Sequence, residues 1–235
     1  MKDAPPIVAA LRRALGEHGD SERAAGQQRY MKSAMPYRGI TSPHLRSIAR
    51  ATFAATPLPQ TRDQWTYAVR LLWDDAAFRE ERYAASLLAQ HRSARGWQDP
   101  MTLGLYRHLV VTGAWWDYVD DVTSHCIAPI LLQHNAAVTP MMREWARADD
   151  LWLRRSAIIG QLPFKDRTDT ALLTDVIEAN VEGTAYGHEF FVRKAIGWAL
   201  RQYARADPDW VRVFVAAHEP QLSGLSKREA LKHLR

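Results

Sequence analysis

Apolar residues recur every three or four positions along most of this chain, and that spacing restricts the fold to helices. It places the apolar side chains on one face of an α-helix. We find no convincing run of alternating β-branched residues of the kind that marks a strand, and we therefore predict an all-α fold. The clearest stripes are Ile7, Leu11 and Leu15, then Trp65, Val69, Leu72 and Trp73, then Val119, Val122 and Cys126.

Two of the predicted helices resemble each other in sequence. Residues 152–158 read like residues 191–197, an offset of 39, and a weaker copy begins at Glu81. A period near 40 built from helix pairs is typical of HEAT-like repeats, which stack into a solenoid with a concave surface for a long ligand. We therefore predict a single HEAT-like repeat α-solenoid domain over residues 1–235. The alternative is a non-repetitive helical bundle in which the similarity arises by chance.

Proline marks several predicted helix starts. A capping side chain directly before proline satisfies an orphan backbone N–H, and proline at the first helical position loses no hydrogen bond. Ser226 and Glu229 have the spacing of a capping box and predict the start of a last helix. The cap–proline pairs are Ser42-Pro43, Asp99-Pro100, Thr139-Pro140 and Asp207-Pro208.

The charge is distributed unevenly. The net charge is +5, and residues 1–60 supply that surplus, with nine Lys and Arg against four Asp and Glu. A basic surplus in a chain with nine tryptophans favours a polyanionic partner. The single cysteine, the lack of a signal-peptide core after Met1 and the lack of a long apolar stretch predict a cytoplasmic protein with no membrane contact.

Motifs for metal or nucleotide chemistry are missing from the sequence. The nine histidines include no HExxH pair or other ligand spacing, and there is no phosphate-binding glycine loop. We therefore expect no metal and no cofactor.

Two residues differ in polarity from the other residues on their helix face. Trp198 shares its face with Lys194, Arg201 and Arg205, so it is either an aromatic platform among phosphate-binding cations or a Trp packed on cationic stems. Arg155 lies on an apolar stripe, which is costly unless it faces an anion or forms a buried structural ion pair. Its neighbour Arg154 has polar face-mates, and we expect it to be an ordinary solvated arginine.

Asp120 is a third candidate. Trp116 lies one turn before it on the same predicted helix, and a carboxylate beside an indole can line a cleft. The alternative is an exposed acidic face, because Asp117 and Asp121 are close by in the sequence.

Five stretches together resemble one known family. They cover the chain from about residue 27 to the end: residues 30–40, 115–120, 151–158, 189–201 and 222–230. In this order they are similar to the AlkD-type DNA alkylation repair glycosylases, which are HEAT-like repeat proteins. The connection 181–187 is a few residues longer than is usual in that family.

The resemblance implies monofunctional removal of cationic N3- and N7-alkylated purines from double-stranded DNA. It also implies an aspartate, two tryptophans and an arginine on the concave, DNA-binding surface. These fall on Asp120, Trp116, Trp198 and Arg155, with Arg154 as the alternative register for the arginine. The competing hypothesis is a catalytically silent HEAT-like DNA-binding or scaffold protein.

We further expect a monomer, with DNA contacts spread over both halves of the chain. The expected DNA-binding residues are Tyr30, Lys32, Thr41, Ser42, Arg154, Lys194, Arg201 and Arg205.

Overall fold

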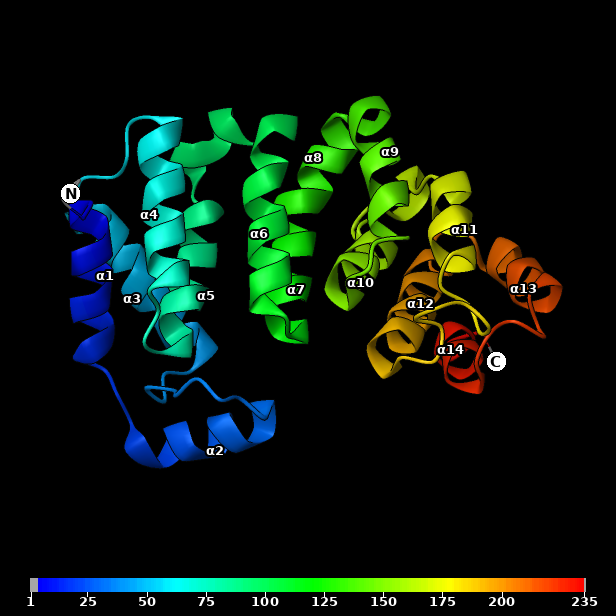
Figure 1. The fold of residues 1–235 in the computed structure, drawn as a ribbon, viewed down its shortest axis with the longest axis horizontal. Helices are drawn as coiled ribbons and strands as arrows, with labels where there is room; N and C mark the ends of the chain where they lie inside the picture. Colours follow the sequence, from blue (N-terminus) through cyan, green and yellow to red (C-terminus); the bar gives the residue numbers. More distant parts are fainter. Residues whose placement is uncertain (1–3, 235) are drawn as a thin grey trace. The chain divides into compact units, whose positions relative to one another are not determined.

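The computed structural model describes residues 4–234, and every regular element within that range is helical (Figure 1). This confirms the predicted all-α fold. The chain divides into two compact units, Met1–Trp97 and Gln98–Arg235. The predicted domain spans residues 1–235, of which residues 1–3 and 235 lie outside the described range. No helix in residues 4–234 is both long and apolar enough to cross a bilayer.

The first unit is a cluster of helices around an apolar core. Helices α1, α3, α4 and α5 pack on one another, while α2 lies across their ends (Figure 1). The predicted stripe of Ile7, Leu11 and Leu15 on α1 is buried, as are Trp65 and Trp73 on α4. The elements are α1 (Pro6–Gly16), α2 (Ser21–Met31), α3 (Ser42–Ala55), α4 (Arg62–Asp74), α5 (Arg79–Ala89) and the 3₁₀ helix η1 (Arg92–Trp97).

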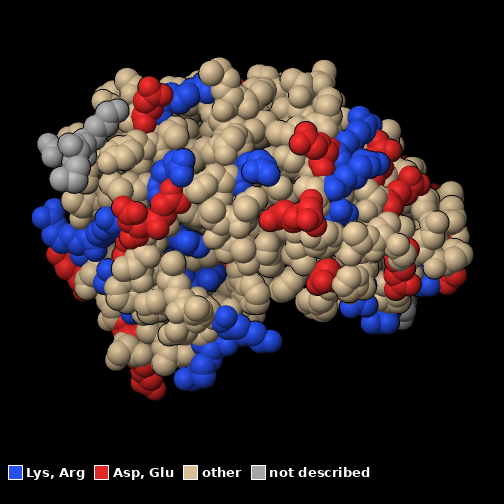
Figure 2. Space-filling model, in the orientation of Figure 1, with Lys and Arg blue, Asp and Glu red and all other residues tan. Residues whose placement is uncertain are grey.

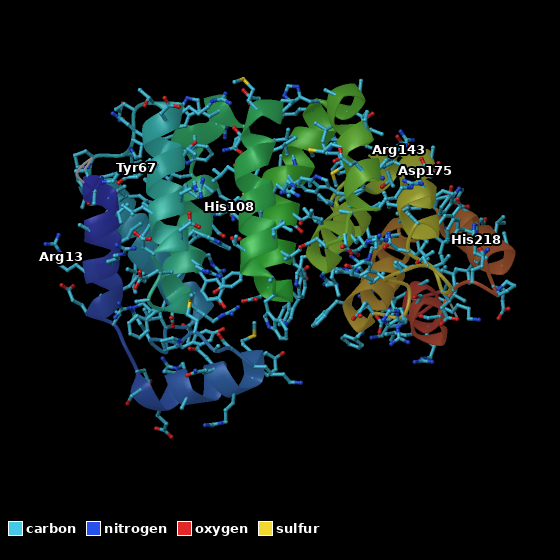
Figure 3. The ribbon with its side chains drawn as sticks, viewed as in Figure 1. Arg13, Tyr67, His108, Arg143, Asp175 and His218 are labelled. Carbon is cyan, nitrogen blue, oxygen red and sulfur yellow. The ribbon has the colours of Figure 1, made fainter. Side chains whose placement is uncertain are left out.

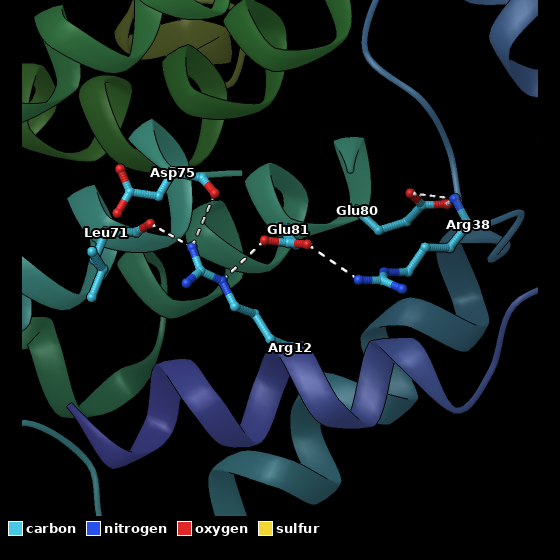
Figure 4. A network of polar contacts seen from close by, with 6 residues as sticks. All are labelled: Arg12, Arg38, Leu71, Asp75, Glu80 and Glu81. Carbon is cyan, nitrogen blue, oxygen red and sulfur yellow. Dashed lines mark hydrogen bonds and ion pairs between the residues drawn. The ribbon is translucent and has the colours of Figure 1, made fainter. Parts of the chain in front are cut away.

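Two buried glutamates at the start of α5 fix the segment that follows α2 (Figure 4). Glu80 accepts the backbone N–H groups of residues 38–40 at 2.9–3.2 Å. Glu81 accepts from Arg12 at 3.0 Å and from Arg38 at 3.3 Å. Buried carboxylates are stable only when their lone pairs are satisfied in this way. The pair thus connects this segment to α5 and, through Arg12, to α1.

Gly39 is required in this segment. Its φ of 86° is left-handed, and a Cβ there would overlap the backbone oxygen of Asp20. We predict that Gly39→Ala lowers the free energy of unfolding by about 2 kcal/mol or more, because a left-handed residue costs about 1–2 kcal/mol and overpacking adds a similar amount. Denaturant unfolding measures the change. Gly26→Ala in α2, where a Cβ meets no atom within 4 Å, is the control and should be neutral or stabilising. Equal stability of Gly39→Ala and the wild-type chain would contradict this account.

The second unit contains two layers of helices. In one layer, Arg143 of α9 pairs with Asp175 of α11 at 2.6 Å, and His218 of α13 hydrogen-bonds Glu178 of α11 at 3.0 Å (Figure 3). In the other layer, α10 packs against α7 and α12, and α12 packs against α14. The elements are η2 (Pro100–Thr102), α6 (Leu103–Gly113), α7 (Trp116–Val122), the π-helical turn η3 (Thr123–Ile127), α8 (Ala128–Gln133), α9 (Asn135–Trp145), α10 (Leu151–Ile159), η4 (Lys165–Arg167), α11 (Thr170–Glu178), α12 (Phe190–Tyr203), α13 (Pro208–Ala217) and α14 (Gly224–Ala230).

The predicted repeat corresponds to neighbouring helices of one layer. Helix α10 begins at Leu151 and α12 at Phe190, which are 39 residues apart (190 − 151), and the two helices are in contact. Equivalent positions of the repeat therefore lie side by side in the second unit, which is the arrangement expected of a solenoid.

Of the five predicted helix starts, two are confirmed with their capping side chains and two are wrong. At the fifth, Pro43 lies in the first turn of α3 as predicted, but the residue before the helix is Thr41 rather than Ser42. Asp99 and Asp207 accept backbone N–H groups at the starts of η2 and α13. Pro140 instead lies inside α9, which begins at Asn135, and the Thr139 side chain is buried in the core. The last helix begins at Gly224 and is capped by Ser223, while Ser226 points to another helix.

Candidate active site

A buried ion pair links two helices of the second unit. Arg155 on α10 donates from Nε to Oδ1 of Asp120 on α7 at 2.7 Å and from Nη2 to Oδ2 at 2.8 Å. Its remaining nitrogen, Nη1, donates to the backbone carbonyl of Phe191 on α12 at 2.7 Å. The side chain of Arg155 is 5% exposed and that of Asp120 is 17% exposed. The guanidinium is therefore fixed on three sides, and the carboxylate keeps limited access to solvent.

Opposing interactions raise and lower the pKa of the Asp120 carboxyl. Burial raises the pKa of its carboxyl above the ordinary value, while the two hydrogen bonds and the positive charge of Arg155 act to lower it. Asp117 and Asp121 raise the pKa further by repulsion. Arg155 therefore offsets part of the tendency of this buried acid to take up a proton.

The helix bearing Asp120 ends in an unusual turn. A π-helical turn begins at Thr123, and such turns are frequent at functional sites. The hydroxyl groups of Thr123 and Ser156 form a buried hydrogen bond at 2.7 Å, next to the ion pair in sequence. This second polar contact joins η3, which directly follows α7, to α10.

An aromatic cluster lies at the starts of the same three helices. The ring of Phe191 contacts Trp115 at 5.5 Å and Trp152 at 5.0 Å between centroids, and it is 5.8 Å from the Arg155 guanidinium. Phe190, which is largely exposed, extends the cluster toward solvent. Sequence reasoning missed these residues. The available signal was the repeat, because Trp152 and Phe191 are 39 residues apart and occupy equivalent positions.

The two predicted tryptophans are placed differently. Trp116 begins α7, one turn before Asp120, and is half-buried. Trp198 is half-buried on α12, on the same face as Phe191 but about 10 Å further along the helix. No hydrogen bond or ring contact within residues 4–234 joins Trp198 to the ion pair. The structure thus brings Asp120 and Arg155 together directly and leaves Trp198 on the neighbouring helix.

Arg154 is buried, so its prediction as a solvated arginine was wrong. Its guanidinium donates to the backbone carbonyls of Arg147 and Ala148 at 3.1 and 2.6 Å, and it stacks on the Tyr186 ring at 4.4 Å. Further donations reach the carbonyl of Ala179 and the side chain of Asn180. The residues that share a helix face with Arg154 could not indicate these partners, because most of the partners lie in loops. The two arginines therefore differ in their partners: Arg154 binds backbone carbonyls and Asn180, whereas Arg155 binds the Asp120 carboxylate and the Phe191 carbonyl.

The predicted basic stripe on α12 is partly neutralised. Lys194 and Arg201 both bind the carboxylate of Glu229 on α14. Arg205 is exposed and forms no ion pair within the described residues. The stripe therefore carries less net charge than its cations alone indicate.

Four predicted DNA-binding residues lie in the first unit. Tyr30 is 77% exposed at the end of α2, and Lys32 caps that helix in a left-handed conformation. Thr41 and Ser42 are exposed at the start of α3, and the Thr41 side chain makes no cap hydrogen bond there. Figure 2 shows basic side chains gathered at the C-terminal end of α2. All four side chains are accessible on the surface of their unit.

Residues 4–234 contain one thiol and no cluster of metal-ligating side chains. Cys126 is buried, and burial raises the pKa of its thiol above the usual range. No group of three His, Cys, Asp or Glu side chains in the described range is arranged to hold a metal ion.

Comparison with known proteins identifies similar sequences and structures. The family described as DNA alkylation repair enzyme matches residues 11–234. Among solved structures, a predicted DNA alkylation repair enzyme from Enterococcus faecalis superimposes with a TM-score of 0.79 at 27% sequence identity, covering 92% of this chain and 97% of the other. A search of curated proteins finds no match.

Proposed function

Because this chain belongs to the family of DNA alkylation repair enzymes, we propose that it is a monofunctional DNA glycosylase. Its substrates are N3- and N7-alkylated purines in duplex DNA, and it hydrolyses their N-glycosidic bond. One observation carries the proposal. The Asp120 carboxylate is fixed by two hydrogen bonds from a buried arginine and keeps access to solvent.

The chemistry of the substrate determines which catalytic groups the protein has to provide. An N3- or N7-alkylated purine is already cationic, so it leaves without protonation by a general acid. Breaking the bond leaves positive charge on the deoxyribose, in a transition state that resembles an oxocarbenium ion. A preorganised carboxylate stabilises such charge and also orients the attacking water. Asp120 is the group that we assign to both roles.

Arg155 acts on the reaction through Asp120. Each of its three nitrogens donates to the protein, two to the carboxylate and one to the Phe191 carbonyl, and the side chain is 5% exposed, so a phosphate has little access to the remaining N–H groups. We therefore assign it as a positioning residue, which holds both carboxylate oxygens and favours the ionised form.

The remaining residues serve DNA binding. Trp116 and Trp198 offer indole faces that attract the developing cation and contact the sugar. The exposed Tyr30, Lys32, Thr41 and Ser42 of the first unit, with Lys194, Arg201 and Arg205 of the second, contact the backbone. In this proposal the protein acts as a cytoplasmic monomer.

The proposal is tested with duplex DNA that carries a single 7-methylguanine. We expect time-dependent release of the free base under single-turnover conditions, with an abasic site left in an intact strand. The same duplex with guanine is the control and should release nothing. Binding to both duplexes without base release would contradict the glycosylase and favour the silent DNA-binding protein.

A further inference from the structure

The sequence between Leu222 and Ala230 docks the last helix on α12. Ser223 caps α14 by accepting the N–H of Ser226 at 3.0 Å, and the Ser226 hydroxyl donates to the Arg193 carbonyl of α12 at 2.9 Å. The helices approach closely at Gly197, where a Cβ would lie 2.5 Å from Cβ of Glu229. This close approach places Glu229 directly over the middle of α12.

Glu229 bridges two cations of α12. Lys194 Nζ lies 2.7 Å from its Oε1, and Arg201 Nη1 binds its Oε2. Lys194 and Arg201 are seven residues apart, so they lie on one face of the helix about two turns from each other. The Glu229 carboxylate occupies the space between them. Both cations lower the pKa of Glu229, and its carboxylate is therefore ionised at neutral pH.

This arrangement leaves an unbalanced positive charge. Two cations face one carboxylate, and the side chains of Lys194 and Arg201 are 42% and 21% exposed, against 17% for Glu229. Trp198, a residue proposed to contact the sugar, lies between the two cations in sequence. A second anion can therefore approach this pair from solvent beside the proposed sugar platform.

We propose that Glu229 is an internal substitute for a DNA backbone phosphate: it occupies Lys194 and Arg201 in the free protein and yields them to a phosphate when DNA binds. A carboxylate and a phosphodiester each present two oxygens that accept from such donors. The Glu229 contact weakens binding to damaged and undamaged DNA alike, because a backbone phosphate must displace the carboxylate before it can bind Lys194 and Arg201. The inference rests on the proposed function only in taking DNA as the ligand.

The test is the affinity for undamaged duplex DNA, measured by fluorescence anisotropy at low and moderate salt. Glu229→Gln keeps the side-chain shape and removes the charge. We expect it to bind about two- to fivefold more tightly at low salt, the scale of one partly exposed ion pair, with the gain shrinking as salt rises. The matched control is Glu219→Gln, which removes the same charge from a carboxylate that pairs with Lys227 instead. It should change affinity much less.

A second variant tests the two cations while the Glu229 side chain itself is kept. Lys194→Gln with Arg201→Gln should weaken binding and should abolish the gain from Glu229→Gln when the changes are combined. Unchanged or weaker binding by a folded Glu229→Gln, or unchanged binding by the double variant, would overturn the inference. Thermal unfolding checks folding, and 7-methylguanine release by the wild-type protein is measured in parallel. Failure of that release refutes the glycosylase and leaves the binding comparison valid.

Discussion

Replacing Asp120 by asparagine is expected to slow 7-methylguanine release by on the order of 10²-fold or more, the scale for losing one preorganised electrostatic group. Asparagine keeps the size of the side chain and one oxygen that Arg155 can still bind. It removes the negative charge that stabilises the cationic sugar. DNA affinity should hold or increase, because a charge that repels phosphate is gone. Single-turnover release and anisotropy measure the two effects separately.

The same change also acts on stability, because asparagine has only one oxygen to accept the two hydrogen bonds that the buried Arg155 donates to Asp120. We expect a loss of about 1–3 kcal/mol in the free energy of unfolding, the usual cost of weakening a buried polar contact. Rates are therefore compared at a temperature where both proteins are folded. Asp121→Asn is the control: it removes the same charge from the next residue, whose partner is His125 rather than Arg155. A folded Asp120→Asn that releases base at the wild-type rate would refute the mechanism.

Much of the fold could be predicted because helix periodicity is a local property. The stripes on α1 and α4 are buried as predicted, and the 39-residue offset locates α10 and α12 as neighbours. The errors occurred where tertiary packing overrode a local signal. Thr139 precedes a proline and could cap a helix, but its side chain is buried in the core of the second unit and α9 starts earlier.

The candidate site could be predicted only in part, for a related reason. The apolar face around Arg155 indicated an arginine in need of an anion, and the anion is Asp120 on another helix. The same test failed for Arg154, whose partners are loop carbonyls that follow no helical spacing. Contacts between helices, such as the bridge at Glu229, have no signature along one helix and required coordinates.

The raised pKa of Asp120 predicts how pH affects stability and activity in opposite directions. Folding raises this pKa, so the folded chain binds the proton more tightly than the unfolded chain. The stability that this carboxyl contributes is therefore fully present below its ordinary pKa and is lost as the pH rises through the raised value. Base release requires the ionised carboxylate and should instead fall as the pH drops through that same value.

Arg155→Met should slow base release at neutral pH by on the order of 10²-fold, since misplacing a reacting group by about 1 Å costs that much. It also removes the hydrogen bonds and the charge that lower the pKa of Asp120, while burial still raises it. The acid limb of the pH–rate profile should therefore move to higher pH, and raising the pH should restore part of the rate. A purely structural role would lower stability without moving that limb.

The comparison with Arg155→Lys separates the effect of orienting the Asp120 carboxylate from the effect of the positive charge at position 155. Lysine keeps the positive charge but cannot hold both carboxylate oxygens in the same plane, so the acid limb should stay closer to the wild-type position while the plateau rate falls. Anisotropy in a salt series decides whether the arginine binds phosphate. A positioning residue should leave the affinity and its salt dependence unchanged in both variants. If Arg155→Met instead weakens DNA binding and flattens the salt dependence while the pH profile stays fixed, Arg155 contacts the backbone and Asp120 keeps its charge without it.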